Sequence, residues 1–188
     1  MRTRQSRRWT SCLLSLALLG AGAGCGTDRE AAARPPTGRD AAPVAHSDAD
    51  EQAAGKAALA AYSGYLGASR AASARSDPGH PALARFVADP LLTRVRLAIR
   101  EAKEHGAMRT GKLVSDPTVV SVNLDADPPT VELQDCLDAT GYRLIYARDR
   151  KVVPGSGGSR HLATATATRY PDGRWLVNVG AAHPDQPC

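Results

Sequence analysis

Apolar residues recur at helical spacing in the middle of the chain and at alternate positions nearer its C-terminus. Leu59, Tyr62, Leu66 and Ser69 fall on one stripe of a helix, which we predict over residues 52–75. A helix with a single stripe of this kind packs that side against the rest of its domain and leaves the other side to solvent.

The sequence SDPG at residues 76–79 breaks this pattern and precedes two further predicted helices. A short helix is expected over residues 81–87. Asp89 is the expected N-cap of the third helix and Pro90 its first helical residue, because a short acidic side chain caps free amides and proline suits the first turn. Gly106 is expected to end this helix.

Three basic residues of the third helix, Arg96, Arg100 and Lys103, lie on a different face from its apolar stripe. Such a face could contact acidic lipid headgroups. Glu101 and Glu104 are interleaved with the basic residues, which favours a solvated helix face instead.

After Gly106 the period of the apolar residues becomes two, as is typical of β-strands. Strands are expected around residues 120–124, 131–133, 142–146, 162–168 and 175–179. The sequence Pro171-Asp172-Gly173 predicts a hairpin turn before the last of them. Helices followed by an antiparallel meander indicate an α+β fold with two or three N-terminal helices packed on one sheet, where Ala163, Ala165 and Ala167 suit the close approach of a helix.

The N-terminus has the features of an export signal, so residues 1–24 are predicted to be a signal peptide. Four arginines precede an uncharged apolar run of 12 residues, 13–24, which is too short to span a membrane as a helix. Ser6-Arg7-Arg8 hints at twin-arginine export, but Thr10 and Ser11 stand where that signal has apolar residues, so the general secretory route is favoured.

The sequence Gly22-Ala23-Gly24-Cys25 resembles the bacterial lipobox, in which a cysteine after small residues is lipidated and becomes the first residue of the mature protein. Cys25 is therefore the expected lipid anchor. Gly22 departs from the motif, where leucine is usual, and cleavage after Ala23 is the alternative, which would release a secreted protein. Residues 25–51 are predicted to be the lipidated N-terminus and a disordered tether, because Val44 is their only large aliphatic residue, and residues 52–188 a single domain.

The cysteine count fits this interpretation. The chain has four cysteines, of which Cys12 leaves with the signal peptide and Cys25 takes the lipid. Cys136 and Cys188 remain, and an exported protein with two cysteines is expected to pair them as a disulfide, with two free thiols as the alternative.

The charge balance argues against a nucleic-acid-binding protein. The chain has 24 basic and 19 acidic residues, a net charge of +5, but four of the arginines belong to the predicted signal peptide. The exported part is therefore close to neutral and lacks the basic excess that nucleic acid binding requires.

Two segments, DPTVVSVNLDADPPTVELQDCLD (116–138) and YPDGRWLVNV (170–179), carry a family resemblance. With the helices before them, they resemble the nuclear-transport-factor-2-like (SnoaL-like) superfamily, and more closely the uncharacterised lipoproteins of Streptomyces and related actinobacteria. The resemblance implies a curved, cone-shaped antiparallel sheet. The superfamily includes ketosteroid isomerases, epoxide hydrolases, polyketide cyclases and many members without chemistry, so it does not choose a function.

Asp135 is the main candidate for chemistry, because it is in phase with Val131 and Leu133 on the inward face of its strand. With Tyr142, Tyr146 and Trp175 it could line one pocket, where burial would raise the pKa of the carboxyl group and make it a base. The alternative is a structural carboxylate at a bulge or sheet edge. No histidine lies near Asp135 in the sequence, and no catalytic residue of the enzymatic relatives can be matched to a position here.

We therefore expect a protein anchored to the outer face of the cell membrane, with a non-catalytic binding or interaction domain. Its expected partners are the membrane, through the lipid, and an envelope protein or a small apolar ligand. The histidines lack metal-ligand spacing and the PGSGGS loop lacks the lysine of a phosphate-binding loop, so neither a metal nor a cofactor is expected. The alternatives are a small-molecule isomerase or hydrolase and an assembly role beside a membrane complex.

Overall fold

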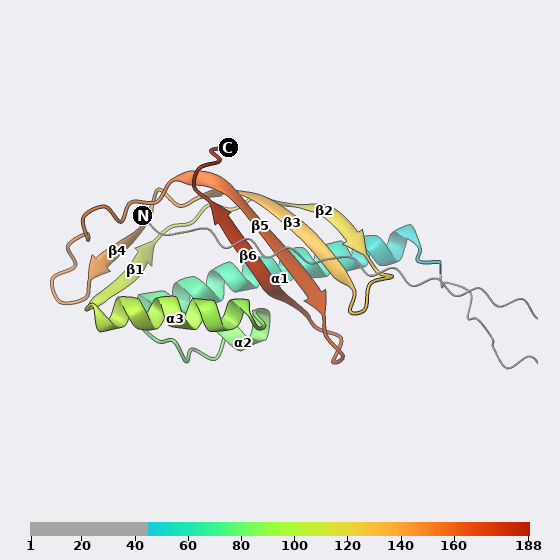
Figure 1. Cartoon of the computed structure of the whole chain (residues 1–188), viewed down its shortest axis with the longest axis horizontal. Coiled ribbons are helices and arrows are strands. Elements are labelled where there is room, and N and C mark those ends of the chain that lie inside the picture. The colour runs from blue at the N-terminus through green and yellow to red at the C-terminus, as the bar shows by residue number, and fades with distance from the viewer. Residues whose placement is uncertain (1–44) are drawn as a thin grey trace, which may run out of the picture. The chain divides into compact units, whose positions relative to one another are not determined.

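The computed structural model describes residues 45–188 and has the predicted α+β architecture (Figure 1). The helices are α1 (Asp48–Ala74), α2 (Leu83–Phe86) and α3 (Leu91–Glu104). The strands are β1 (Ala107–Gly111), β2 (Pro117–Asn123), β3 (Thr130–Asp138), β4 (Tyr142–Tyr146), β5 (Arg160–Arg169) and β6 (Trp175–His183).

Helix α1 begins at Asp48, earlier than the predicted residue 52. Ser47 is its N-cap: the Ser47 hydroxyl accepts a hydrogen bond from the Asp50 amide at 3.3 Å, and the Asp50 carboxylate accepts one from the Ser47 amide at 3.1 Å. The first turn of α1 therefore contains Asp48, Asp50 and Glu51, which belong to the predicted tether. The helix dipole favours negative charge at this end of a helix.

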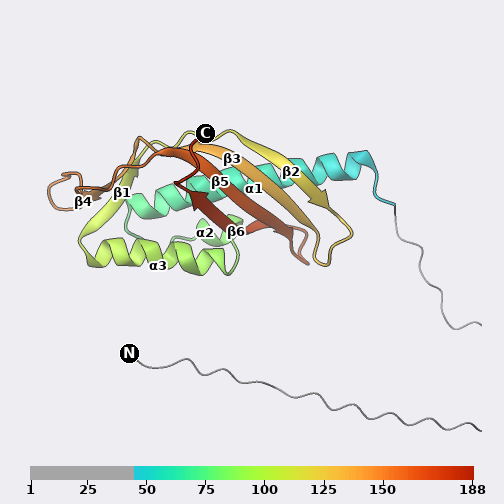
Figure 2. The same cartoon turned by 45° about the horizontal axis from the view of Figure 1, so that its top comes forward.

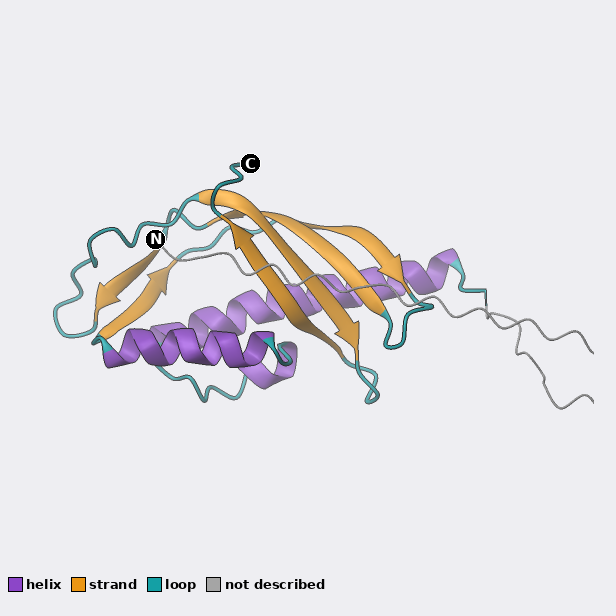
Figure 3. Ribbon diagram, viewed as in Figure 1, coloured by secondary structure: helices purple, strands orange, loops and turns teal. Residues whose placement is uncertain are grey.

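The four longer strands of the C-terminal half form one antiparallel sheet in the order β2-β3-β5-β6 (Figure 3). The prediction that Tyr142–Tyr146 continues this meander is wrong, because β4 pairs with β1 in a separate two-stranded sheet. Strand β1 was not predicted, since its sequence AMRTG has no apolar alternation.

This second sheet contains a close backbone approach. Gly111 has φ of +112°, and a side chain there would collide with the carbonyl group of Gly141. Glycine is therefore required where β1 and β4 meet.

The curved four-stranded sheet arches over α1, and α3 lies beside α1 in both views (Figure 1; Figure 2). Ala163, Ala165 and Ala167 of β5 are buried, as predicted for a strand that a helix approaches closely. The facing side of α1 is also rich in buried alanines, at positions 54, 58, 61, 68 and 72. Small side chains on both elements allow this close packing.

The connection from α2 to α3 differs in detail from the prediction. The N-cap of α3 is Pro90 rather than Asp89. The Asp89 carboxylate nevertheless accepts hydrogen bonds from the Thr93 amide at 3.1 Å and the Thr93 hydroxyl at 2.6 Å, so it satisfies a free amide of the first turn from one position earlier.

Candidate functional site

Asp135 lies on the inward face of β3, in phase with Val131 and Leu133, and its residue surface is only 2% exposed. Its carboxylate accepts three hydrogen bonds. The donors are the Tyr62 hydroxyl at 3.0 Å, the Ser115 hydroxyl at 2.7 Å and the Asp116 amide at 2.8 Å. The carboxylate therefore joins α1, the segment that leads into β2, and β3.

Tyr62 stays protonated in this arrangement. Burial raises the pKa of Tyr62 well above its usual value, and the negative charge of Asp135 raises it further. A protonated Tyr62 donates its hydrogen bond at every physiological pH. The tyrosine beside Asp135 thus comes from α1 rather than from the predicted strand that carries Tyr142 and Tyr146.

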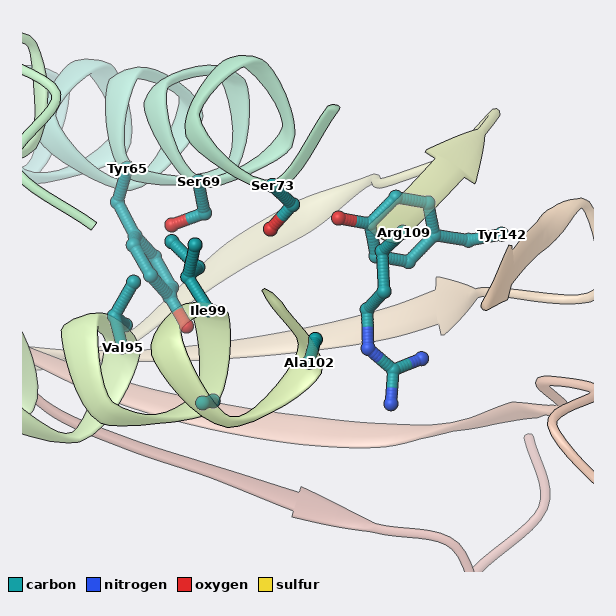
Figure 4. Close-up of a pocket in the computed structure, with 9 residues that line it drawn as sticks. Tyr65, Ser69, Ser73, Val95, Ile99, Ala102, Arg109 and Tyr142 are labelled. Atoms are coloured by element: carbon teal, nitrogen blue, oxygen red, sulfur yellow. The ribbon is translucent and has the colours of Figure 1, made fainter. Parts of the chain in front are cut away.

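A separate cavity of about 170 Å³ lies between α1, α3 and the two-stranded β1–β4 sheet (Figure 4). Its lining includes Tyr65, Ser69 and Ser73 of α1, Val95, Ala98, Ile99 and Ala102 of α3, Arg109 of β1 and Tyr142 of β4. The wall formed by α3 is entirely apolar, and the polar groups come from α1 and the β1–β4 sheet.

Two polar features mark this cavity. The Ser69 hydroxyl is buried and has no hydrogen-bond partner within residues 45–188. Arg109 is the one charged residue in the lining, and its guanidinium lies 6.0 Å from the centre of the Tyr142 ring. Burial raises the pKa of Tyr65, which therefore remains a neutral hydroxyl at the cavity wall.

The four residues predicted to line one pocket are distributed over the molecule. Tyr142 lines the cavity, and its lining does not include Asp135, Tyr146 or Trp175. Tyr146 lies opposite Ala107 in the β1–β4 sheet. Trp175 packs half-buried against the core at the start of β6. The separation follows from the placement of β4 outside the large sheet.

Sequence reasoning missed the polar residues of the cavity for identifiable reasons. Ser69 lies on the predicted apolar stripe of α1. A hydroxyl within such a stripe is the signal that could have identified it as a cavity residue. Arg109 had no signal, because β1 itself was not predicted.

Cys136 and Cys188 form a disulfide, which confirms the predicted pairing. Cys136 follows Asp135 on β3, so its side chain points to the opposite face of the sheet. The Arg160 guanidinium donates a hydrogen bond to the Cys136 sulfur at 3.1 Å, and the Leu162 amide donates one to the Gln186 carbonyl at 2.9 Å. The C-terminal segment is therefore fixed to the sheet by one covalent bond and by the backbone.

Two further observations concern only the described part of the chain. Residues 45–188 contain no group of three His, Cys, Asp or Glu side chains arranged to hold a metal ion. None of the helices in this range is long and apolar enough to cross a membrane. The predicted signal peptide (1–24), the predicted lipid anchor Cys25 and most of the predicted tether lie outside the described residues.

Comparisons with known proteins give a distant structural similarity only. No family model matches the sequence, and no curated protein is significantly similar to it. The crystal structure of the intermembrane space region of the chloroplast protein ARC6 is similar with a TM-score of 0.42 and 16% sequence identity. The similarity covers 68% of this chain and 95% of that chain.

Proposed function

We propose that the protein is an exported cell-envelope lipoprotein, anchored through Cys25, whose α+β domain binds a small apolar ligand without catalysing a reaction. The arginine-rich N-terminus, the apolar run of 13–24 and the cysteine that follows support export and lipidation. The Cys136–Cys188 disulfide supports an oxidising compartment, where such bonds persist.

The observation that carries the binding role is the separation of the cavity from the buried carboxylate. The cavity lining has serine and tyrosine hydroxyls and one arginine, but no carboxylate, imidazole or thiol that could act beside them as a general base. Asp135, the buried carboxylate, is held by three donors from two other segments. A small apolar cavity without such groups favours binding over chemistry.

The α+β arrangement, with helices against one face of a curved antiparallel sheet, is also compatible with the nuclear-transport-factor-2-like (SnoaL-like) superfamily. We propose this kinship, and with it a relation to actinobacterial lipoproteins, on the segments 116–138 and 170–179.

The Tyr62–Asp135 pair favours a second candidate, a small-molecule isomerase or hydrolase. A tyrosine hydroxyl beside a carboxylate is a pair that acid–base catalysis uses. Tyr62 borders a second cleft of about 100 Å³, but Asp135 does not line it. An enzyme would require this carboxylate to reach a ligand there.

The proposed membrane location of the protein is tested by substituting Cys25 and by determining the mass of the mature chain. Cys25→Ser is expected to move the protein from the membrane fraction to the soluble extracytoplasmic fraction, whereas Cys12→Ser, the matched control, leaves it in the membrane. Intact-mass analysis of the wild type should show a chain that begins at Cys25 and carries added lipid mass. A mature chain that begins at Gly24 without lipid would contradict the anchor.

The binding role is tested with an uncharged probe, 3-phenylpropanol. Ala102 lines the cavity from α3, so Ala102→Leu fills part of the space and is expected to reduce binding by about tenfold. Lys103→Leu, at the exposed neighbouring position, adds a similar side chain outside the cavity and should leave binding unchanged. Equal binding by both variants would place the probe elsewhere.

A further inference from the structure

We propose that the cavity between α1, α3 and the β1–β4 sheet selects ligands in which one anionic group is attached to a compact apolar group. The inference rests on the proposed binding function and adds the charge and size of the ligand. It is carried by Arg109, by the buried hydroxyl of Ser69 and by the cavity volume.

The charge preference follows from Arg109. No acidic residue lines the cavity. Arg109 takes part in none of the ion pairs formed within residues 45–188, which involve His46, Arg148 and Arg174. Its guanidinium lies at one end of the cavity, beside the Tyr142 ring (Figure 4). A guanidinium with free donors binds a carboxylate or phosphate through two parallel hydrogen bonds.

Inside the cavity, the Ser69 hydroxyl is available to form a hydrogen bond with a ligand. It is buried without a hydrogen-bond partner, and its oxygen points into the space between α1 and α3 (Figure 4). Buried hydroxyls are nearly always hydrogen-bonded, and an unpaired one costs free energy. A ligand oxygen in the cavity would give Ser69 its partner. The Ser73 hydroxyl lies nearer the β1–β4 sheet, between Ser69 and Tyr142 (Figure 4).

The apolar part of the ligand is limited by size. A protein cavity of about 150 Å³ accommodates one benzene molecule. The space here is about 170 Å³, and Val95, Ile99 and Ala102 line it with aliphatic carbon. It therefore fits one six-membered ring or a short branched chain, with the anionic group toward Arg109.

The test compares three probes of one shape and different charge: 3-phenylpropionate, 3-phenylpropanol and 3-phenylpropylamine. Binding to the full chain, in nanodiscs of neutral phosphatidylcholine, is measured by calorimetry against empty nanodiscs. We expect the acid to bind about three- to fivefold more tightly than the alcohol, since Arg109 is exposed to solvent, and the amine to bind most weakly. Arg109→Gln should remove the advantage of the acid, so that the variant binds the acid and the alcohol with similar affinity.

Arg143→Gln is the matched control, because Arg143 of β4 is exposed like Arg109 but does not line the cavity. It should retain the preference for the acid. Equal affinity for acid and alcohol, or a preference that survives Arg109→Gln, overturns this inference but leaves the binding function intact. Failure of all three probes to bind overturns both.

Discussion

The hydroxyl of Tyr62 on α1 donates a hydrogen bond of 3.0 Å to the buried carboxylate of Asp135 on β3, across 73 positions of sequence. The same carboxylate accepts hydrogen bonds from Ser115 and from the Asp116 amide. The next residue, Cys136, ties the C-terminal end to the other face of the sheet through its disulfide. Two adjacent residues of β3 thus fix three other segments of the chain.

Asp135→Asn is expected to destabilise the fold. The asparagine oxygen can still accept from the Asp116 amide, but its NH2 group then faces the Tyr62 and Ser115 hydroxyls, which must turn from donors into acceptors and lose a charged partner. Loss of a hydrogen bond to a charged group should lower the free energy of unfolding by about 1.5–3 kcal/mol, measured by urea denaturation. Asp116→Asn, at the exposed neighbouring carboxylate, is the control and should have little effect. Equal stability of the two variants would show that Asp135 is not structural.

Stability should fall at alkaline pH through Tyr62. The pKa of Tyr62 is raised above its ordinary value of 10.0, first by burial and then by Asp135. The unfolded chain loses this proton near pH 10 and the folded chain keeps it, so the stability from Tyr62 is complete below that pH and is lost above it. In urea unfolding between about pH 8 and pH 11, the difference between wild type and Tyr62→Phe should therefore shrink as pH rises. A difference that stays constant over this range would contradict the role given to Tyr62.

Reduction of the disulfide should destabilise the protein without unfolding the sheet. The bond closes a loop with a sequence separation of 52, for which the chain-entropy model gives about 4 kcal/mol. Cys136→Ser combined with Cys188→Ser should lower the melting temperature of the protein in non-reducing buffer. In reducing buffer, wild type and the double variant should melt together, and a difference that persists there would assign the effect to the serines.

Gly111→Ala should disturb the cavity from a distance. A methyl group at Gly111 would meet the Gly141 carbonyl, and φ of +112° is unfavourable for alanine. The β1–β4 pairing should loosen and displace Tyr142, so binding of 3-phenylpropanol should weaken together with a loss of roughly 1–3 kcal/mol in stability. Gly157→Ala is the control, because an added methyl group there has open space around it. Unchanged binding of 3-phenylpropanol by Gly111→Ala would show that the β1–β4 sheet does not shape the cavity.

The elements that follow a simple period were predictable from sequence. The apolar stripe through Tyr62 gave α1, and the alternation through Ala163–Ala167 gave β5 and its packing against a helix. Asp135 was correctly placed inward because its strand keeps a period of two. The disulfide followed from counting cysteines.

The cavity was not predictable, because it depends on long-range pairing. Strand β4 alternates as well as any other, and its sequence does not say that its partner is β1 rather than β3. The close backbone approach of Gly111 and Gly141 within this pairing leaves no periodic signal either. Because the β1–β4 sheet is separate from the four-stranded sheet, Tyr142 lines the cavity with α1 and α3, and Asp135 does not.

The central claim is that ligand binds between α1 and α3 while Asp135 only supports the fold. It is tested most directly by following the backbone amide resonances of the protein during a titration with 3-phenylpropanol. The account predicts that the amides of Ser69, Ile99 and Tyr142 shift with one common affinity, and that those of Asp116 and Asp135 do not move. Shifts at Asp116 and Asp135 with unchanged resonances along the cavity would contradict it and favour an isomerase-like site at the carboxylate.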